Sequence, residues 1–213
     1  MNYYGEYVTR LIEQFGKLPG IGGRSAQRLA FYVLNMPKEN AEALARSIVE
    51  AREHVRYCSS CCNLTDTDPC PVCSSSKRNK NQIMVVESPR DMAAYEKTKD
   101  FKGVYHVLHG LISPMDGVTP SDIRIKELLA RLNDNTEEVI LATASTIEGD
   151  TTAMYIARLI ALNHGKIKLS RIAKGVPVGG ELEYVDQMTL ATALKGRFEM
   201  NTGKDWEDDD EDN

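Results

Sequence analysis

The chain has 213 residues, of which 42% are hydrophobic and 27% are charged. This length is enough to bury a core and predicts two or three small structural units. No stretch approaches the roughly 18 consecutive apolar residues that a membrane-spanning helix needs. The first residues also lack the basic start and apolar run of a secretory signal, so we expect a cytoplasmic protein without a membrane segment.

The formal net charge of −5 is unevenly distributed along the sequence. Residues Asp205–Asn213 contain seven acidic side chains and no basic one. The rest of the chain is therefore close to neutral. We expect residues 201–213 to be a disordered, solubilising tail, because like charges repel and little apolar surface is available to bury. Competition of this tail with nucleic acid for a basic surface is the alternative.

Residues 1–56 show the periodicity of a helical domain. Apolar residues recur three and four positions apart between Val8 and Phe15 and again between Ala26 and Val33. A third helix is predicted from about Glu39 to Tyr57. Its apolar residues are expected to point inward, and they are Ala41, Leu44, Ala45, Ile48 and Val49.

The first two predicted helices are joined by a glycine-containing turn, Leu18-Pro19-Gly20-Ile21-Gly22, in the manner of a helix-hairpin-helix. Glycines allow close backbone approach, and the free N–H groups that open the second helix can bind a phosphate. Three cations flank the turn, so the sequence favours DNA binding without sequence readout. The candidate contacts are Lys17, Gly20, Gly22, Arg24 and Arg28. An ordinary helix turn is the alternative.

Two C-x-x-C pairs follow, in the order Cys58-x2-Cys61-x8-Cys70-x2-Cys73. Four thiolates at this spacing suit one tetrahedral Zn²⁺, and they leave no open position for substrate. The predicted metal site is therefore structural. Disulfide pairing is the alternative, and Cys62 is interpreted as an incidental free cysteine with a minor chance of acting as a substitute ligand.

After residue 80 the sequence alternates between predicted strands and helices. A short apolar run at residues 83–86 predicts a strand buried on both faces, and further strands are predicted at 104–108, 139–142 and 167–172, with helices at 89–99, 121–132 and 151–163. This β-α-β order predicts a mainly parallel sheet covered by helices on both faces. Functional groups in such sheets lie at the carboxyl ends of the strands, which directs attention to Glu87, His109 and residues 143–150.

These motifs occur in the order found in the RecR family of bacterial recombination mediators, which the chain resembles over roughly residues 5–200. The helix-hairpin-helix, the four cysteines and Glu87 are followed by two further matching segments, residues 103–114 and 125–129. A late glycine-rich stretch, Gly175-Val176-Pro177-Val178-Gly179-Gly180-Glu181-Leu182-Glu183-Tyr184, completes the resemblance. The order of the motifs is more specific than any one of them.

The resemblance implies that the β-α-β unit is a Toprim domain. Catalytic Toprim domains hold Mg²⁺ with a glutamate after the first strand and an Asp-x-Asp pair after a later one. Glu87 occupies the first place, but Ala144 and Thr146 stand where the paired aspartates would be. The remaining carboxylates, Glu87 and Glu148, form a poor Mg²⁺ site, so we expect no catalysis. Ala144-Ser145 also departs from the Asn-Pro that is frequent in the family.

The resemblance further implies partners of the RecO and RecF type, with Glu87, Glu148 and Asp150 as candidate contacts. Favourable acids at a helix N-terminus are the alternative for Glu148 and Asp150. The Gly175–Tyr184 stretch contains no Walker A loop, and it is interpreted as a turn into a C-terminal arm that packs on a neighbouring subunit. His106 is expected to be a packing residue.

The predicted fold class is multi-domain, with α and α/β parts. Its segments are a helical domain (1–56), a zinc module (57–76), a Toprim-like domain (80–174), a C-terminal segment with a helix (175–200) and the acidic tail (201–213). The predicted function is that of a non-enzymatic DNA-binding clamp in recombinational repair. The resemblance implies a tetrameric ring that works with RecO and RecF to load RecA on gapped or single-stranded DNA and associates with the nucleoid. The alternatives are a Mg²⁺-dependent Toprim nuclease or primase that uses Glu87, or a pure protein–protein adaptor.

Overall fold

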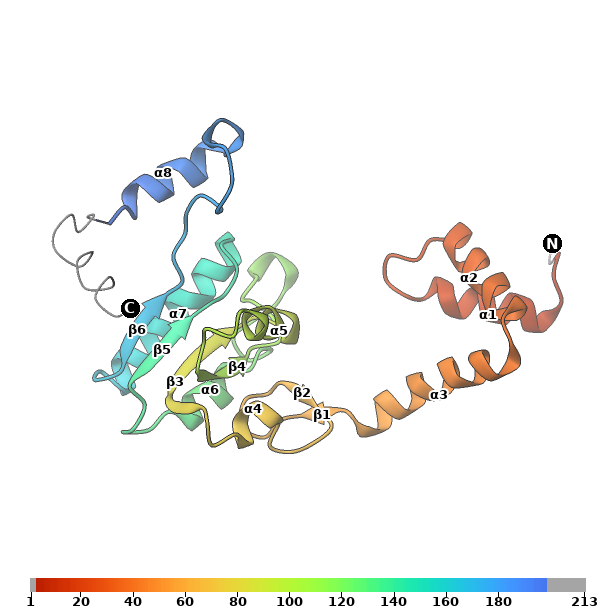
Figure 1. Ribbon diagram of the computed structural model, residues 1–213, viewed down its shortest axis with the longest axis horizontal. Coiled ribbons are helices and arrows are strands. Elements are labelled where there is room, and N and C mark those ends of the chain that lie inside the picture. The colour runs from red at the N-terminus through yellow and green to blue at the C-terminus, as the bar shows by residue number, and fades with distance from the viewer. Residues whose placement is uncertain (1–2, 199–213) are drawn as a thin grey trace, which may run out of the picture. The chain divides into compact units, whose positions relative to one another are not determined.

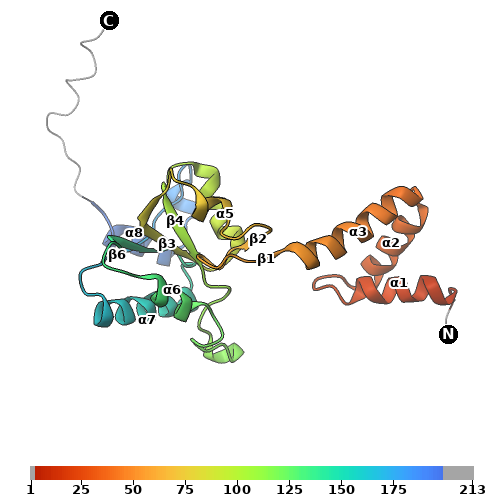
Figure 2. The same ribbon diagram turned by 90° about the horizontal axis from the view of Figure 1, so that it is seen from below.

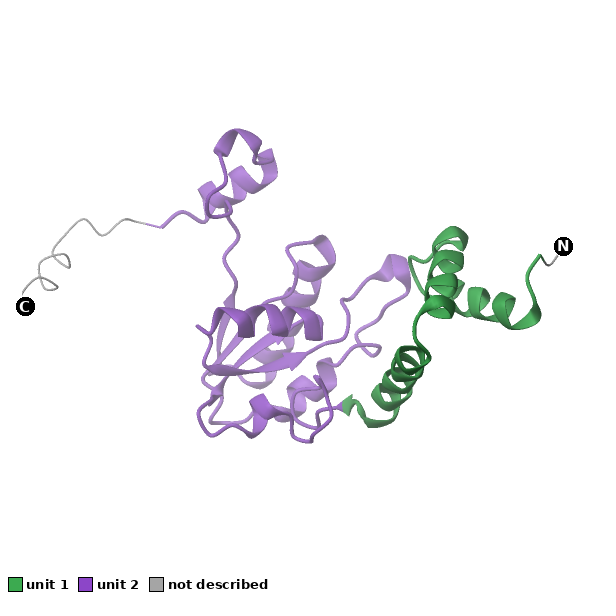
Figure 3. Cartoon of the chain, turned by 45° about the vertical axis from the view of Figure 1, so that its right-hand side comes forward, with its two compact units in different colours: residues 1–56 green, residues 57–213 purple. Residues whose placement is uncertain are grey.

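The computed structural model describes residues 3–198, which form two compact units, one ending at Arg56 and the other beginning at Tyr57 (Figure 3). The predicted acidic tail lies outside the described residues, as do the last two positions of the predicted C-terminal segment. Among the described residues, no helix is long and apolar enough to cross a membrane.

The first unit contains three helices, α1 (Glu6–Gly16), α2 (Gly23–Asn35) and α3 (Lys38–His54) (Figure 1). Helices α1 and α2 form an antiparallel hairpin with small residues at its centre. Ala26 and Ala30 are buried, and a Cβ atom at Gly16 would lie 3.8 Å from the Cβ of Ala26. The small side chains let the two helices approach closely.

The inward direction predicted for the apolar residues of α3 is wrong within a single chain. The helix buries none of its residues, and Leu44, Ile48 and Val49 are exposed. The 3.6-residue periodicity is present, but it does not specify what covers the apolar face. The helix also ends at His54, three residues before the predicted end.

The second unit begins with a small module that contains a two-stranded sheet, β1 (Arg56–Tyr57) with β2 (Leu64–Thr65), and a short helix, α4 (Pro71–Ser74). A four-stranded parallel sheet follows in the order β4-β3-β5-β6. Its strands are β3 (Asn79–Val86), β4 (Gly103–Val107), β5 (Glu138–Leu141) and β6 (Lys168–Arg171).

Helices cover both faces of this sheet, as the sequence predicts. Figure 2 shows α5 (Pro89–Thr98) on one face and α6 (Ile125–Arg131) with α7 (Ile147–Asn163) on the other. The α6/α7 side holds the larger core, which includes Ile83, Leu128 and Ile156. Met84, Met92 and Tyr105 belong to the smaller core on the α5 side. Both faces of β4 and of the second half of β3 are buried, which explains the continuous apolar run Ile83–Val86.

Two helix starts differ from the prediction. Helix α6 begins at Ile125 instead of residue 121, because Asp122 accepts hydrogen bonds from the N–H (2.8 Å) and hydroxyl (2.6 Å) of Thr119. This local turn competes with helical hydrogen bonding. Helix α7 begins four residues early, at Ile147, because the hydroxyl of Thr146 accepts from the N–H of Gly149 (3.1 Å) and caps the helix.

The chain leaves the sheet through a glycine turn and ends its described part in a short arm. The arm contains a 3₁₀ turn, η2 (Leu182–Tyr184), and helix α8 (Gln187–Lys195). A 3₁₀ turn, η1 (Pro114–Asp116), lies earlier in the unit. Helix α8 buries no residue, and the arm exposes Val178, Tyr184 and Met188.

Candidate metal centre and nucleic-acid interface

The four predicted cysteine ligands meet in the module at the start of the second unit. Their Sγ atoms all lie within 4.8 Å of one another, and all four side chains are buried. The Sγ atoms of Cys61 and Cys70 are 3.6 Å apart. Zn–S bonds of about 2.3 Å in a tetrahedron place sulfur atoms about 3.8 Å apart, so the residues fit one Zn²⁺ ion. Among the described residues, no other group of three or more His, Cys, Asp or Glu ligand atoms lies this close together.

Backbone hydrogen bonds shape the two cysteine knuckles. The N–H of Cys58 donates to the carbonyl of Asn63 (2.7 Å), and the N–H of Cys70 donates to the Sγ of Cys58 (3.3 Å). The pKa of Cys73 falls to about 5 because its sulfur accepts a hydrogen bond from Cys61, whose own pKa rises for the same reason. A thiolate inside this buried cluster is suited to bind a cation.

The module is fastened to the end of the adjacent strand β4. The N–H of Val107 donates to the carbonyl of Cys61 (2.9 Å), and Nε2 of His109 donates to the carbonyl of Cys62 (2.6 Å). Cys62 is not part of the sulfur cluster, and its backbone lies in the left-handed region at φ 61°. The metal centre thus holds the module in shape, and hydrogen bonds join that shape to the sheet.

The predicted helix-hairpin-helix turn leaves open space around its glycines. Gly20 adopts φ +78°, which favours glycine, and the N–H of Ile21 donates to the carbonyl of Leu18 (3.1 Å). Gly22 is the N-cap of α2 and supplies no side chain to the free N–H groups that follow it. A Cβ atom at Gly22 would meet nothing within 4 Å, so the space before the helix is accessible.

Three exposed cations surround this turn. Lys17 is the C-cap of α1, and its Nζ lies 3.4 Å from the side-chain oxygen of Gln14. Arg24 and Arg28 lie one turn apart on α2, and neither forms an ion pair within the described part of the chain. Exposed cations beside free N–H groups at a helix start form an arrangement that can bind phosphates.

The carboxyl ends of the strands carry the remaining predicted residues. Glu87 follows β3 and is half-buried, and its pKa is raised by burial and by the nearby charge of Asp91. Glu148 lies in the first turn of α7, where it is half-buried without an ion pair among residues 3–198. These two acids are not joined by a third ligand into a compact metal-binding group in the described structure.

Asp150 lies in the same helical turn but is already paired. Its carboxylate binds Arg171 (3.1 Å) and Lys174, and the hydrogen bond from Lys174 lowers its pKa most. Arg171 also donates to the carbonyls of Leu141 (2.8 Å), Thr143 (2.8 Å) and Ala144 (3.0 Å). Sequence reasoning missed Arg171 and Lys174, although cations at the carboxyl end of the last strand were a usable signal.

The loop held by Arg171 is tightly closed. A Cβ atom at Gly149 would lie 2.1 Å from the carbonyl oxygen of Ala144, and the hydroxyl of Thr143 donates to the carbonyl of Gly149 (2.7 Å). Ala144, where the family frequently has asparagine, therefore lies at a point where main-chain contacts set the shape of the loop between β5 and α7. His106 lies elsewhere, fully buried on β4, and donates from Nε2 to the carbonyl of Arg124 (2.7 Å).

A hairpin with an open helix start, a four-cysteine metal centre and a parallel Toprim-like sheet define a multi-domain nucleic-acid-binding protein. The comparisons with known proteins give the same domains in order. The chain matches the RecR helix-hairpin-helix family over residues 8–52, the RecR four-cysteine zinc finger domain over 55–75, the Toprim domain over 81–173 and the RecR C-terminal family over 175–197.

Two curated relatives are similar over nearly the whole chain. "Recombination protein RecR" of Pelotomaculum thermopropionicum is 57% identical over 201 residues, which cover 94% of this chain and 100% of the relative. "Recombination protein RecR" of Clostridium perfringens is 53% identical over 197 residues, covering 92% and 98%. The chain belongs to the RecR family of recombination proteins, and a role in recombinational repair and a zinc-finger domain follow from this membership.

Proposed function

We propose that this protein is a non-enzymatic DNA clamp that binds DNA without sequence specificity and helps RecO- and RecF-type partners load RecA at gaps. The observation that carries this proposal is the uncapped start of α2 beside Lys17, Arg24 and Arg28. Backbone N–H groups and unpaired cations bind the sugar–phosphate chain, which is the same for every sequence.

DNA binding by the wild type and by Arg24→Ala/Arg28→Ala at two or more salt concentrations tests the interface. We expect weaker binding, and a slope of log K against log salt that is smaller by about 2, because each lost phosphate contact removes about 0.9 for a duplex. Arg46→Ala/Arg52→Ala removes the same charge from exposed positions on α3 and serves as the matched control. Equal binding by the two double variants would place the DNA site elsewhere.

The proposal of a clamp requires several chains, and exposed apolar surface supports a homo-oligomer. Leu44 and Ile48 on α3, and Val178 and Tyr184 on the C-terminal arm, are exposed within one chain. A ring of four subunits would bring several hairpins to one DNA molecule and raise the affinity through effective concentration. It would also cover these side chains, since large exposed apolar surfaces mark interaction sites.

Solution mass measured by light scattering tests this assembly. Ile48→Asp places a charge on the apolar face of α3 and should lower the mass, whereas Ala43→Asp adds the same charge at an exposed position on the opposite side of the helix. A wild-type mass of one chain at micromolar concentration would contradict the ring. An equal loss of mass in both variants would mean that the added charge, and not the apolar face, is responsible.

We also propose that the carboxyl edge of the sheet contacts a RecO-type partner rather than performing catalysis. Glu87 and Glu148 are half-buried acids without ion pairs among the described residues, and Ile147 beside them is 83% exposed. Asp150 belongs to the same proposed surface, although its charge is already offset by Arg171 and Lys174. Association with the nucleoid in the bacterial cytoplasm would follow from DNA binding.

Two measurements separate this role from its rivals. Glu148→Lys should weaken the binding of a RecO-type protein at least tenfold, since it reverses a charge at an interface, and should leave DNA binding by this protein alone unchanged. The same preparation is tested for cleavage or primer synthesis with Mg²⁺. Mg²⁺-dependent turnover that Glu87→Gln abolishes would establish the Toprim enzyme instead of the clamp.

A further inference from the structure

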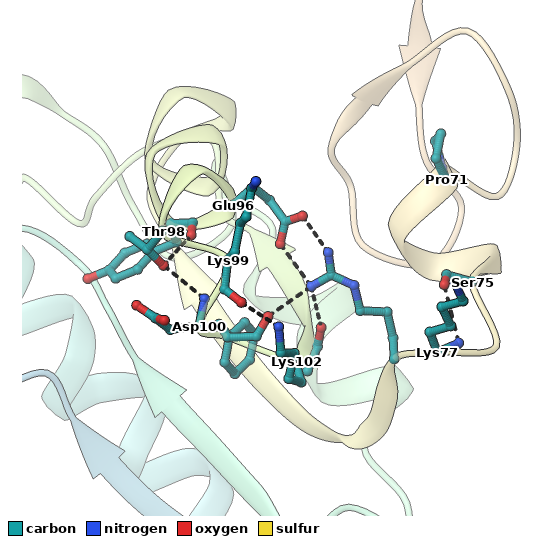
Figure 4. A network of polar contacts seen from close by, with 12 residues as sticks. Pro71, Ser75, Lys77, Glu96, Thr98, Lys99, Asp100 and Lys102 are labelled. Carbon is teal, nitrogen blue, oxygen red and sulfur yellow. Dashed lines mark hydrogen bonds and ion pairs between the residues drawn. The ribbon is translucent and has the colours of Figure 1, made fainter.

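A second concentration of positive charge lies in the second unit, at the end of the sheet opposite to Glu87. It surrounds a pocket of about 400 Å³ at the amino ends of β3 and β4. The pocket is lined by Ser75, Lys77, Arg78, Glu96, Lys99, Phe101 and Lys102. Figure 4 shows Ser75 and Lys77 on the loop that leaves α4, and Glu96, Lys99 and Lys102 around the end of α5.

The residues that line this pocket include four cations and one carboxylate, that of Glu96, which forms an ion pair with Arg78. Arg78 forms a two-pronged ion pair with Glu96 and donates further to the carbonyls of Phe101 (3.1 Å) and Gly103 (3.3 Å). Burial alone would raise the pKa of Glu96, but Arg78 keeps it below its ordinary value. Glu96 therefore stays ionised and binds Arg78 with both carboxylate oxygens, so the residues that line the pocket carry a net positive charge from Lys77, Lys99 and Lys102.

Two of the three lysines, Lys99 and Lys102, have a local structural role at the C-terminal end of α5. All three are exposed, and none forms an ion pair within residues 3–198. Cations near a helix C-terminus interact favourably with the helix dipole, which explains Lys99. Lys77 comes instead from the loop that follows the metal centre, and Lys102 lies beyond the helix just before β4. Charges from two segments, the loop after α4 and the connection between α5 and β4, thus meet around one pocket.

The backbone supports this arrangement at Lys99. This residue is the C-cap of α5 and has a left-handed backbone with φ 63°, a conformation for which glycine or asparagine is the usual choice. A lysine there costs about 1 kcal/mol relative to glycine. Its backbone carbonyl accepts a hydrogen bond from Nζ of Lys102, which holds the Lys102 side chain against the end of α5.

Phe101 adds an aromatic surface to the same pocket. Its ring packs edge-on against Tyr105 with centroids 5.1 Å apart, and it lies over Gly103, where a Cβ atom would come within 2.4 Å of the ring. The ring is thus fixed and half-buried, with its remaining surface in the pocket. Lysines beside a fixed aromatic ring are typical of surfaces that track a nucleic-acid backbone.

We propose that this basic pocket is a second DNA contact, which binds backbone phosphates independently of the hairpin. The inference rests on the proposed DNA binding of the protein and adds a site on the other compact unit. Phosphates from a single strand or from a duplex could supply the same chemistry. The contacts would position DNA without reading its sequence, because lysine ammonium groups bind phosphate as point charges.

The test is DNA binding by the full-length triple variant Lys77→Ala/Lys99→Ala/Lys102→Ala, with a single-stranded oligonucleotide and with its duplex, over a range of salt. We expect lower affinity for at least one substrate and a smaller salt slope, by about 2 to 3, because three phosphate contacts are lost. The matched control Lys126→Ala/Lys166→Ala/Lys195→Ala removes the same charge from exposed lysines away from the pocket. The triple Lys→Arg variant keeps the charge and should bind as the wild type does.

Two outcomes would refute the proposal that this pocket is a second DNA contact. Binding of both substrates within about twofold of the control triple would show that its lysines do not contact phosphates, and an equal loss in both triples would show only an effect of net charge. Arg24→Ala/Arg28→Ala is measured in parallel. Wild-type protein that binds no DNA would refute the proposed function itself, whereas binding that depends on the hairpin alone would refute only the second contact. Zinc content in each variant confirms that the metal centre is intact.

Discussion

The two compact units of this protein differ in how much of their apolar surface is buried within one chain. In the second unit, helices cover both faces of the sheet, and Ile83, Val85 and Leu128 are nearly inaccessible to solvent. Among the described residues of the first unit, only Ala26 and Ala30 are buried, while large side chains of α3 remain exposed. A sequence pattern therefore predicts that a helix has an apolar face, but it does not say what covers that face. Within one chain, the sheet covers the helices of the second unit, whereas the apolar face of α3 in the first unit stays exposed.

The largest expected effect concerns the metal centre, because it replaces a hydrophobic core in the module. Cys61→Ser should abolish zinc binding and disorder residues 57–74, since structural Zn²⁺ contributes on the order of 10 kcal/mol to such folds. Metal content and circular dichroism measure this. Cys62→Ser is the matched control, because Cys62 lies outside the ligand group, and it should retain one zinc per chain. Native structure in a zinc-free protein would refute a structural metal.

A core substitution in each unit measures the difference between them directly. Leu128→Ala should lower the free energy of unfolding by about 3 kcal/mol, because Leu128 is completely buried beneath the sheet. Leu44→Ala should cost about 1 kcal/mol or less in a single chain, because Leu44 is 42% exposed. Denaturant unfolding at several protein concentrations tests both. A concentration-dependent loss for Leu44→Ala alone would show that another copy covers α3.

His106 makes the second unit sensitive to acid. Burial lowers its pKa to about 4, below the ordinary value of 6.5, so the folded state resists a proton that the unfolded state accepts. Stability is therefore retained above about pH 6.5 and lost as the pH falls toward 4, by about 2 kcal/mol at pH 5. His106→Gln should show a flatter pH dependence than the wild type over this range. Parallel stability curves for the two proteins would exclude His106 as the source.

The smallest expected difference between the two units is in the coupling energy of their ion pairs. Arg10 and Glu6 on α1 are both more than 60% exposed, so a double-mutant cycle should give a coupling of about 0.3 kcal/mol. Arg78 and Glu96 are mostly buried and share a two-pronged contact, so their coupling should exceed about 1 kcal/mol. Thermal unfolding of the single and double variants supplies both values. Equal couplings would mean that burial does not distinguish these pairs.

The sequence predicted most of the elements because their signals are local. Cysteine spacing identified the metal ligands, and the apolar runs identified the parallel strands and the helices on both faces. The start of α6 was misplaced because a side-chain turn at Asp122 competes with the helix, and the start of α7 because Thr146 caps it. The contacts of Arg171 could not be predicted in this way, because they join segments about 30 residues apart in the sequence and form only in the completed sheet.

Arg171 has a consequence for the edge where catalytic Toprim domains hold a divalent ion. Its guanidinium binds three main-chain carbonyls and the carboxylate of Asp150, so a fixed positive charge organises the loop between β5 and α7. The occupancy of an ion site depends on the concentration of the free ion, whereas an arginine side chain is covalently attached and is always present. The contacts that set the shape of this loop therefore do not depend on the concentration of an ion, because the guanidinium that makes them is part of the chain.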